Sequence, residues 1–246
     1  MEEPEYRAMF DVEETHWWFV ARREFLRELL VHLPSKSLRI ADIGAGTGGM
    51  TGFLRQYGTV IGIEPNKAGR MLAKRRGIIL RSGDAQRTGI PSKSVDVVCF
   101  FDVLYHRGIH DTHALMEAKR MLRPGGWLVI TDCALPFLTG PHDRAVAGRE
   151  RYTLAGLCTK VTSTGFLIEK KTYMYFCIFP VVIIKRLIDR FAVQTNGHRS
   201  DVKPVNVWIN ALCTMLSRIE AKGLAYVSYP WGSSLFILAR IPGGKR

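Results

Sequence analysis

Closely spaced glycines and an acid follow a short apolar run early in the chain. Residues 39–50 read Arg-Ile-Ala-Asp-Ile-Gly-Ala-Gly-Thr-Gly-Gly-Met, with strand character at the start and helical character from Met50. Glycines in such a turn let the backbone bend sharply and bring main-chain atoms close to a ligand. The pattern predicts a nucleotide-type binding turn at the carboxyl end of a parallel strand.

The glycine turn fits two classes of nucleotide. Residues 44–49 satisfy G-x-G-x-x-G, and Glu64 follows at the distance of the ribose-binding acid in a dinucleotide fold. The other spacing is acid-x-Gly-x-Gly-x-Gly, which Asp42 opens and Gly48 closes. A carboxylate suits a ligand that carries an ammonium and a sulfonium better than it suits a pyrophosphate. Asp42 therefore favours the second class.

Further acids follow the next apolar runs at regular intervals. Residues 59–64 predict a second strand that ends at Glu64, and residues 78–84 predict a third that ends at Asp84. Residues 95–101 form a fourth apolar run, which leads into Asp102 and His106. Residues 122–126 read Leu-Arg-Pro-Gly-Gly before a fifth run. Carboxyl ends of parallel strands meet at one edge of a sheet, so these acids should share a crevice.

In their order and spacing, these motifs resemble class I S-adenosylmethionine (SAM)-dependent methyltransferases. The resemblance implies SAM as cofactor and S-adenosylhomocysteine (SAH) as product. It implies a ribose contact for Glu64, an adenine contact for Asp84, and a place for Asp102 beside the methionine end of SAM. The remaining residues expected at the cofactor are Asp42, Gly44, Ala45, Gly46, Gly48 and Ala85.

The N-terminal segment is unusually aromatic and basic. Residues 11–33 predict one amphipathic helix, which opens with Glu-x-x-His-Trp-Trp-Phe over 13–19. An arginine of such a helix, Arg22 or Arg23, can pair with the methionine carboxylate of SAM, beside a tryptophan of the pocket wall. We take Trp18 and Arg22 as this pair. The alternative is that both tryptophans are core or interface anchors.

Nearly the whole chain resembles one bacterial-type family of class I methyltransferases. Besides the aromatic helix, it shows His142-Asp143 followed by Arg-Tyr at 151–152, and Pro-x-Gly-x-Ser-Leu at 230–235. This family is functionally mixed and is often associated with lipid, glycan or natural-product pathways. Tyr105 stands where a Glu is common in the family.

Two histidines are candidates for the general base. His106 follows the fourth strand, and His142 with Asp143 lies in the loop after the fifth. Histidine titrates near neutral pH, which suits removal of a proton from an acceptor hydroxyl or ammonium. A hydrogen-bonded structural histidine is the alternative for each.

Alternating strands and helices predict an α/β fold. We expect a Rossmann-like, seven-stranded, mostly parallel sheet with an antiparallel last strand and helices on both faces, plus a helical cap inserted between the last two strands. The expected parts are an N-terminal helical lid segment over 1–37, a SAM-binding core over 38–176, the cap over 177–230, and the final strand with its tail over 231–246. The cap consists of helical runs over 177–191 and 205–222 joined by a polar loop.

Composition and charge limit the partners. The 246 residues are 47% hydrophobic and 23% charged, which indicates a globular chain. The acidic start and the short apolar runs predict a cytoplasmic protein, and five scattered cysteines predict a reducing compartment and no metal site. No RNA-binding module explains the net charge of +13, so no nucleic-acid partner is expected. The apolar run 173–184, followed by basic residues, could instead contact a membrane or a lipid-linked substrate, or form a homodimer surface.

The leading hypothesis is a methyltransferase that acts on an oxygen or nitrogen of a small-molecule or lipid-linked acceptor. Two alternatives keep SAM but change its use. One is cyclisation or transfer of the aminocarboxypropyl chain, and the other is a non-catalytic SAM-binding subunit of a partner enzyme. NAD binding is a distant further alternative, because no Tyr-x-x-x-Lys pair accompanies the glycine turn.

Overall fold

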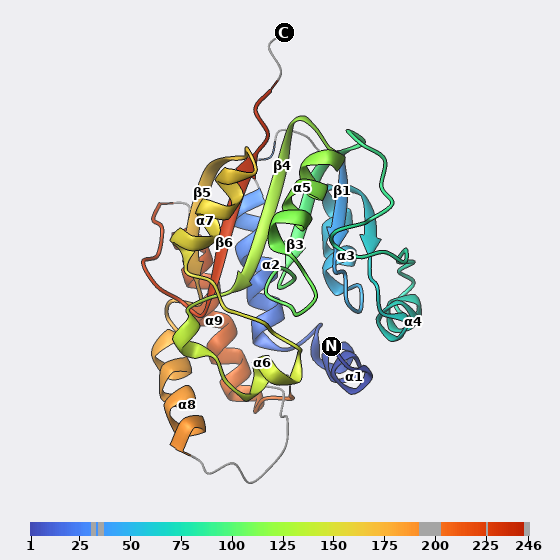
Figure 1. Ribbon diagram of the computed structural model, residues 1–246. Coiled ribbons are helices and arrows are strands. Elements are labelled where there is room, and N and C mark those ends of the chain that lie inside the picture. The colour runs from blue at the N-terminus through green and yellow to red at the C-terminus, as the bar shows by residue number, and fades with distance from the viewer. Residues whose placement is uncertain (31–32, 34–36, 192–202, 225, 244–246) are drawn as a thin grey trace.

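The computed structural model describes residues 1–243 except 31–32, 34–36, 192–202 and 225. Within these residues one sheet runs through the molecule, with strands in the order β2-β1-β3-β4-β6-β5 (Figure 1). The strands are β1 (Leu38–Ile43), β2 (Gly58–Ile63), β3 (Val95–Phe101), β4 (Leu122–Cys133), β5 (Leu167–Met174) and β6 (Ser234–Arg240). The first four are parallel, and β6 is antiparallel to both of its neighbours.

The described sheet has six strands, one fewer than predicted. The expected third strand, residues 78–84, is reduced to a single bridge between Arg81 and Ile63 of β2. Backbone hydrogen bonds from Arg81 N to Gly62 O and from Glu64 N to Arg81 O hold it there. Ile79 is exposed beside this bridge. Its neighbours Ile78 and Leu80 are buried against Ala45 and Ala73, so the run packs its apolar side chains without pairing along the sheet, and its pattern could not reveal this.

Helices cover both faces of the sheet. One face carries α5 (Asp111–Met121) and α7 (Leu154–Ser163), which pack on Val98, Phe100 and Leu128 in one apolar core. The other face carries α2 (Trp17–Leu30) and α9 (Val207–Gly223), which pack on Ile40 and Phe236 in a second core (Figure 1). The α3 (Gly49–Leu54), η1 (Arg55–Tyr57) and α4 (Lys67–Arg75) segments follow β1 and β2. This double covering is the reason the central strands are apolar throughout.

The N-terminal segment forms two helices rather than the single one predicted over 11–33. α1 (Glu3–Val12) ends before residue 13, and α2 begins at Trp17. Glu13 lies in the break, where it is buried, accepts a hydrogen bond from Thr47 Oγ1 and lies 3.2 Å from Arg76. A continuous helix could not place α1 across the glycine turn while α2 lies on the sheet.

The predicted insertion contains the two helices expected of it, α8 (Phe179–Phe191) and α9. Glu220 of α9 accepts hydrogen bonds from Phe176 N and Cys177 N, which joins the end of β5 to α9 ahead of α8. α9 packs along α2, and Asn210 of α9 accepts a hydrogen bond from Trp17 N. Part of the predicted polar loop, 192–202, lies outside the described residues. A role for α8 and α9 as a cap over the cofactor stays a prediction.

Near the carboxyl ends of the parallel strands lie η2 (Pro136–Leu138), α6 (Pro141–Ala145), α1, α8 and α9 (Figure 1). Of the helices that the structure describes, none is both long enough and apolar enough to cross a membrane.

Candidate functional site

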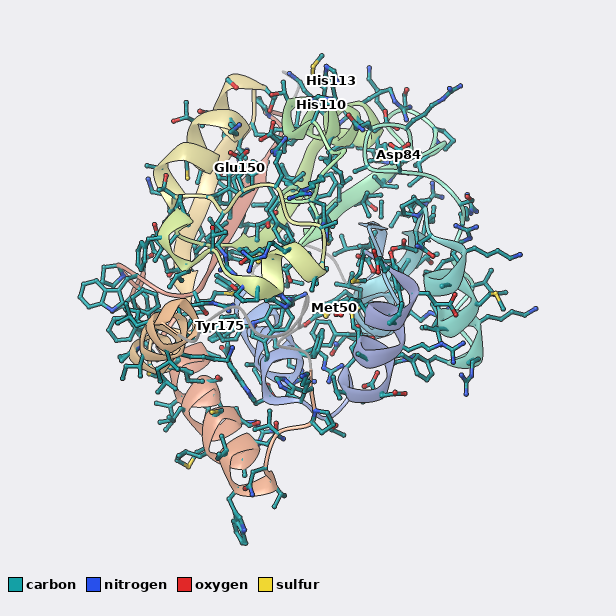
Figure 2. The ribbon with its side chains drawn as sticks, turned by 60° about the horizontal axis from the view of Figure 1, so that its bottom comes forward. Met50, Asp84, His110, His113, Glu150 and Tyr175 are labelled. Atoms are coloured by element: carbon teal, nitrogen blue, oxygen red, sulfur yellow. The ribbon has the colours of Figure 1, made fainter. Side chains whose placement is uncertain are left out.

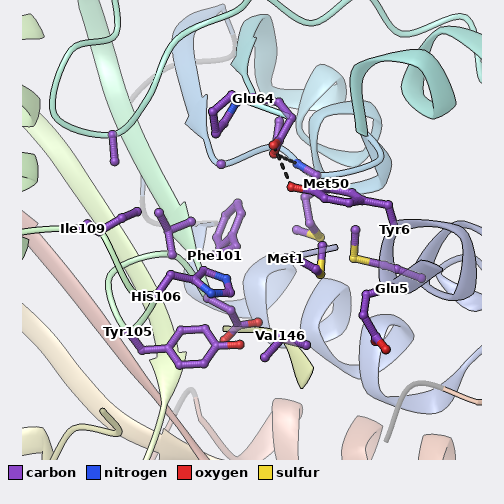
Figure 3. Close-up of a pocket in the computed structure, with 18 of the residues that line it drawn as sticks. Met1, Glu5, Tyr6, Met50, Glu64, Phe101, Tyr105, His106, Ile109 and Val146 are labelled. Carbon is purple, nitrogen blue, oxygen red and sulfur yellow. Dashed lines mark hydrogen bonds between the residues drawn. The ribbon is translucent and has the colours of Figure 1, made fainter. Parts of the chain in front are cut away.

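A cavity of about 400 Å³ lies at the carboxyl ends of β1, β2 and β3, beneath α1 (Figure 3). Ligand pockets for small molecules are commonly of this size. Twelve of the residues predicted at the site line it: Trp18, Arg22, Asp42, Gly44, Ala45, Gly46, Glu64, Asp84, Ala85, Asp102, His106 and His142. The described structure therefore brings together acids and bases from segments that lie between Trp18 and His142 in the sequence.

The glycine turn between β1 and α3 has the backbone that its sequence predicts. Gly44, Gly46 and Gly48 have φ of +74°, +57° and +84°, a region that favours glycine. A Cβ on Gly44 would come within 2.5 Å of Val103 Cγ2, so this position also needs the missing side chain. Gly48 caps α3 and is not among the lining residues, so its contribution is to the shape of the turn.

Glu64 is buried at the end of β2 and is fixed by three donors. Tyr6 Oη lies 2.8 Å from Oε1, Asn66 N lies 2.9 Å from the same oxygen, and Gly46 N lies 2.8 Å from Oε2 (Figure 3). Burial raises the pKa of Glu64, and these hydrogen bonds oppose the rise. Oε2 keeps acceptor capacity for a ligand hydroxyl, since a carboxylate oxygen accepts about two hydrogen bonds.

Asp42 is the penultimate residue of β1, and its side chain is buried. Its Oδ2 accepts a hydrogen bond from Thr51 Oγ1 at 2.6 Å. Burial is the main cause that raises the pKa of Asp42 to about 7, and the Thr51 hydrogen bond acts against it. This carboxyl therefore exchanges its proton near neutral pH, in a cavity expected to bind a cation.

Asp84 lies at the exposed rim of the cavity. Its Oδ1 accepts hydrogen bonds from Gln86 N at 2.7 Å and Arg87 N at 3.0 Å, which close a tight turn around buried Ala85. The second oxygen has no hydrogen bond among those found in the described residues. This arrangement fits the adenine contact that the resemblance implies.

An ion pair between Arg22 and Asp102 joins α2 to the end of β3. Arg22 is buried and its guanidinium carbon lies 4.1 Å from the ring centre of Trp18, a cation–π geometry. Asp102 has a φ of +55°, which turns the chain sharply after β3. Arg22 Nε and Asp102 Oδ1 are buried without hydrogen-bond partners in the described structure. Unsatisfied buried groups of opposite charge at a cavity wall are suited to a zwitterionic ligand.

The structure distinguishes between the two arginines and the two tryptophans of the aromatic helix. Arg23 points away from the cavity and lies 3.2 Å from Glu14, and Trp17 packs edge-on against Tyr175. Trp17 thus has the anchoring role that was the alternative for both tryptophans, whereas Trp18 and Arg22 reach the cavity.

The two candidate bases lie on the cavity wall opposite α1. His106 is mostly buried against the ring of Tyr105, with centroids 4.4 Å apart, and its Nδ1 has no hydrogen-bond partner. Burial lowers the pKa of His106 to about 4, so the ring is neutral at pH 7. His142 of α6 also lines the cavity.

Asp143 has a different position from its neighbour. It is buried outside the cavity lining, accepts from Gly140 N at 2.8 Å and pairs with Arg151 at 2.8 Å. These contacts hold the loop after β4 in place. A role for Asp143 in orienting His142 stays a prediction.

Several cavity residues were not identified from the sequence. Three of them belong to α1 or to the residue after it: Tyr6, Met9 and Glu13. No local motif in the sequence predicts that α1 crosses the glycine turn. Cys133 lines the cavity beside Asp132, and burial raises the pKa of Asp132 well above its usual value, with the nearby Asp102 adding to the effect. Asp132 is the penultimate residue of β4 and lies outside the cavity lining, and no motif of the sequence marks Cys133 as part of the site.

The cavity residues fit the cofactor that the resemblance implies. The glycine cradle, Asp84 at the rim, Glu64 and the unsatisfied Arg22–Asp102 pair supply groups suited to the adenine, ribose and methionine parts of SAM. The fit rests on the chemistry of these side chains and main-chain groups.

This chain is similar in sequence to known methyltransferases. Residues 41–130 match the family model described as a methyltransferase domain. The phthiotriol/phenolphthiotriol dimycocerosates methyltransferase 1 of Mycobacterium ulcerans is 32% identical over 108 residues, which cover 41% of this chain and 40% of that protein. The fatty-acid O-methyltransferase of Mycolicibacterium smegmatis is 30% identical over 116 residues, 44% of this chain and 42% of that protein. The chain thus matches less than half the length of these curated relatives.

The fold is shared over nearly the whole chain. A SAM-dependent methyltransferase of Thermotoga maritima superposes with a TM-score of 0.59 at 18% identity, covering 96% of this chain and 95% of that one. At this identity the likeness concerns the fold.

Proposed function

We propose that this chain, which carries a class I SAM-dependent methyltransferase domain, transfers a methyl group from SAM to an oxygen or nitrogen of a small, apolar acceptor. SAM is the cofactor of this domain. The observation that carries the proposal is the cavity itself, whose lining combines Glu64 at the glycine turn, the Arg22–Asp102 pair and two histidines. Bound SAM supplies a methyl group already activated on a sulfonium.

The residues of the chain then have three tasks. Glu64, with Gly46 N, holds the ribose, and Arg22 with Asp102 holds the methionine end. This positioning aligns the acceptor with the methyl group, which is the largest contribution that a protein can make to such a transfer. The α1 segment, with Met9 over Gly46, excludes water from the reacting atoms.

The third task is removal of a proton from the acceptor. His106 Nδ1 is neutral at pH 7 and has no partner in the described structure, so it can accept a proton. His142 is the second candidate, on α6. Neither histidine needs to be charged before the reaction, which is consistent with a base rather than an acid.

The chemical class of the acceptor is inferred from the cavity lining. Phe101, Val103, Ile109 and Val146 form an apolar wall next to His106. One curated relative is named a fatty-acid O-methyltransferase, which agrees with such a wall. A small or lipid-linked acceptor with one polar atom near His106 is the acceptor we propose.

Calorimetry with SAM, SAH and NAD tests the cofactor, and mass spectrometry of the products tests the reaction. We expect saturable binding of SAM and SAH, no binding of NAD, and SAH as the product once an acceptor is supplied. The Glu64→Gln variant should bind SAH roughly tenfold to a hundredfold more weakly, because charge-assisted hydrogen bonds to the ribose are lost. Glu169→Gln, which alters an exposed acid of β5 paired with Arg240, is the matched control and should bind normally.

Other outcomes have defined meanings. If methylthioadenosine forms instead of SAH, the reaction uses the aminocarboxypropyl chain of SAM and not its methyl group. Binding without turnover across lipid, fatty-acid and small aromatic acceptors would favour a non-catalytic SAM-binding subunit. Failure of both SAM and SAH to bind would refute the proposal.

A further inference from the structure

The outer faces of α8 and α9 are apolar, which is the reverse of what surface helices usually show. On α9, Trp208, Leu212, Met215 and Ile219 are all exposed, with Trp208 at 81% and Met215 at 51%. Their spacing of four, three and four residues puts them on one stripe of the helix. Figure 2 looks toward this end of the molecule and shows side chains of α9 projecting outward.

The stripe lies on the side of α9 that faces away from the protein. The side that packs on α2 carries buried Ser217 and Ala221 together with Asn210, which binds Trp17 N. At about 100° per residue, these positions lie roughly opposite the stripe. The exposed apolar residues therefore have no packing role within the described chain.

α8 repeats this arrangement. Val181, Ile184 and Ile188 are exposed, again three and four residues apart. We define the two stripes, Val181–Ile188 on α8 and Trp208–Ile219 on α9, as the apolar face. Both helices lie at the end of the sheet where the cavity also lies (Figure 1). Exposed apolar patches formed by several large side chains on a protein surface mark sites of interaction.

The charges around the apolar face indicate what covers it. Among the described side chains of 179–188 and 203–224, every exposed charged residue is basic: Lys185, Lys203, Arg218 and Lys222. Glu220, the acid of this region, is buried and accepts hydrogen bonds from Phe176 N and Cys177 N, between β5 and α8. The whole chain carries a net charge of +13. An apolar face with Trp at its end and a basic margin complements an anionic lipid surface.

We propose that the apolar face of α8 and α9 docks this protein peripherally on a membrane that contains anionic lipids. The stripes insert at the boundary between headgroups and acyl chains, and the basic residues contact lipid phosphates. No part of this proposal depends on methyl transfer. It would, however, place the cavity end of the sheet next to the membrane.

Vesicle flotation tests the docking. Wild-type protein should float with vesicles of phosphatidylcholine plus phosphatidylglycerol, should float much less with phosphatidylcholine alone, and should be released by high salt. Met215→Glu should lower the vesicle-bound to free ratio about tenfold, because burial of one methionine side chain is lost. The matched control is Met116→Glu on α5, where the methionine is 58% exposed on another helix; its flotation should equal that of the wild type.

The electrostatic part has its own variant. Lys203→Glu combined with Lys222→Glu should lower binding to the anionic vesicles by more than about tenfold, since each basic residue near such a surface contributes about fivefold. Binding of SAH, measured on every variant, reports whether the fold and the cavity are intact. A variant that no longer binds vesicles but still binds SAH supports membrane docking independently of the proposed enzyme activity.

Three results would overturn the inference. They are wild-type protein that does not float with anionic vesicles, equal binding of Met215→Glu and wild type, and equal binding to neutral and anionic vesicles. Sedimentation could instead show that the wild type self-associates and that Met215→Glu abolishes this self-association, while neither protein binds vesicles. The apolar face would then contact a second copy of the chain, and the membrane proposal would be wrong.

Discussion

The hydroxyl of Tyr6 lies 2.8 Å from Glu64 Oε1, across 58 positions of sequence. A residue of α1 therefore donates to the acid that should bind the ribose of SAM. Burial, followed by the charge of Glu64, raises the pKa of the Tyr6 hydroxyl, so this group stays a donor at all physiological pH values. Asn66 N occupies the same oxygen. Of the two ribose hydroxyls, one can bind Oε2, and the one that binds Oε1 would compete with Tyr6.

The Tyr6→Phe substitution should therefore strengthen cofactor binding. Loss of one competing hydrogen bond, worth about 1 kcal/mol, should lower the Kd for SAM and SAH about fivefold in calorimetry. Tyr57→Phe, at the end of η1 and away from the cavity, should leave both unchanged. Weaker binding of Tyr6→Phe would instead mean that this hydroxyl contacts the ligand directly.

The affinity for SAM should depend on pH through Asp42. Its pKa of about 7, raised mainly by burial, means that the carboxyl gains charge as the pH rises from about 6 to 8. SAM carries a sulfonium and SAH does not, so the SAM-to-SAH affinity ratio should increase over this range. In Asp42→Asn the ratio should be flat with pH. A wild-type ratio that does not change with pH would rule out Asp42 as the group that senses the sulfonium.

The same shift has an opposite consequence for folding. Unfolded Asp ionises near pH 4 and folded Asp42 near 7, so the unfolded state releases its proton first as the pH rises. The contribution of Asp42 to stability should therefore be present below about pH 4 and be lost as the pH rises toward 7. Urea unfolding of wild type and Asp42→Asn at several pH values measures it, and Asp96→Asn serves as a control on a partly exposed acid.

His106 should behave in the opposite sense. Burial lowers its pKa to about 4, so between about pH 6.5 and 4 the unfolded state binds a proton that the folded state does not. Stability from this group is present above about 6.5 and falls as the pH drops toward 4. His106→Gln should remove this dependence. His113→Gln, on the partly exposed α5, should not.

The pH–rate profile separates the two candidate bases. If His106 removes the acceptor proton, the acidic limb of kcat/KM should lie near pH 4 rather than near 6.5, and His106→Gln should lower kcat by about 100-fold or more. His142→Gln should then have a smaller effect. An acidic limb that disappears in His142→Gln but persists in His106→Gln would assign the base to His142.

The buried pair of Arg22 and Asp102 should be costly to break on one side. Arg22→Met leaves Asp102 buried without its partner and should lower the free energy of unfolding by about 3–5 kcal/mol. The double variant Arg22→Met with Asp102→Asn should be more stable than Arg22→Met alone. Arg27→Met, which removes a half-exposed partner of Glu24 on the same helix, should cost less than about 1 kcal/mol. If the effects of Arg22→Met and Asp102→Asn on the free energy of unfolding are additive in the double variant, the two residues are not coupled.

Local motifs predicted most of the cofactor site because its residues occupy fixed places after strands. Gly44, Glu64 and Asp102 each follow an apolar run, and parallel strands necessarily bring their carboxyl ends together. The helical character predicted from Met50 and the helical runs predicted over 177–191 and 205–222 correspond to α3, α8 and α9 within a few residues. For these elements the local pattern and the tertiary environment favour the same conformation.

The differences arise where distant contacts decide the outcome. The periodicity of 11–33 continues through Glu13, yet the helix breaks there because Glu13 is bound by Thr47 and Arg76. Nothing near Tyr6 in the sequence indicates a partner 58 residues away. The third strand is reduced for a similar reason, since Ile78 and Leu80 of its apolar run are buried against Ala45 and Ala73 without pairing along the edge of the sheet.

That reduced strand has a consequence for how the protein opens. The backbone N–H of Glu64 is bonded to Arg81 O, and Arg81 N to Gly62 O, in a bridge one residue long. Segments with so few backbone bonds exchange their amide hydrogens through local opening, without unfolding of the whole chain. The ribose acid is thus attached to one of the least secured parts of an otherwise continuous sheet. Cofactor affinity should begin to fall in mild denaturant before the core unfolds, and amide exchange at Glu64 should slow when SAH binds.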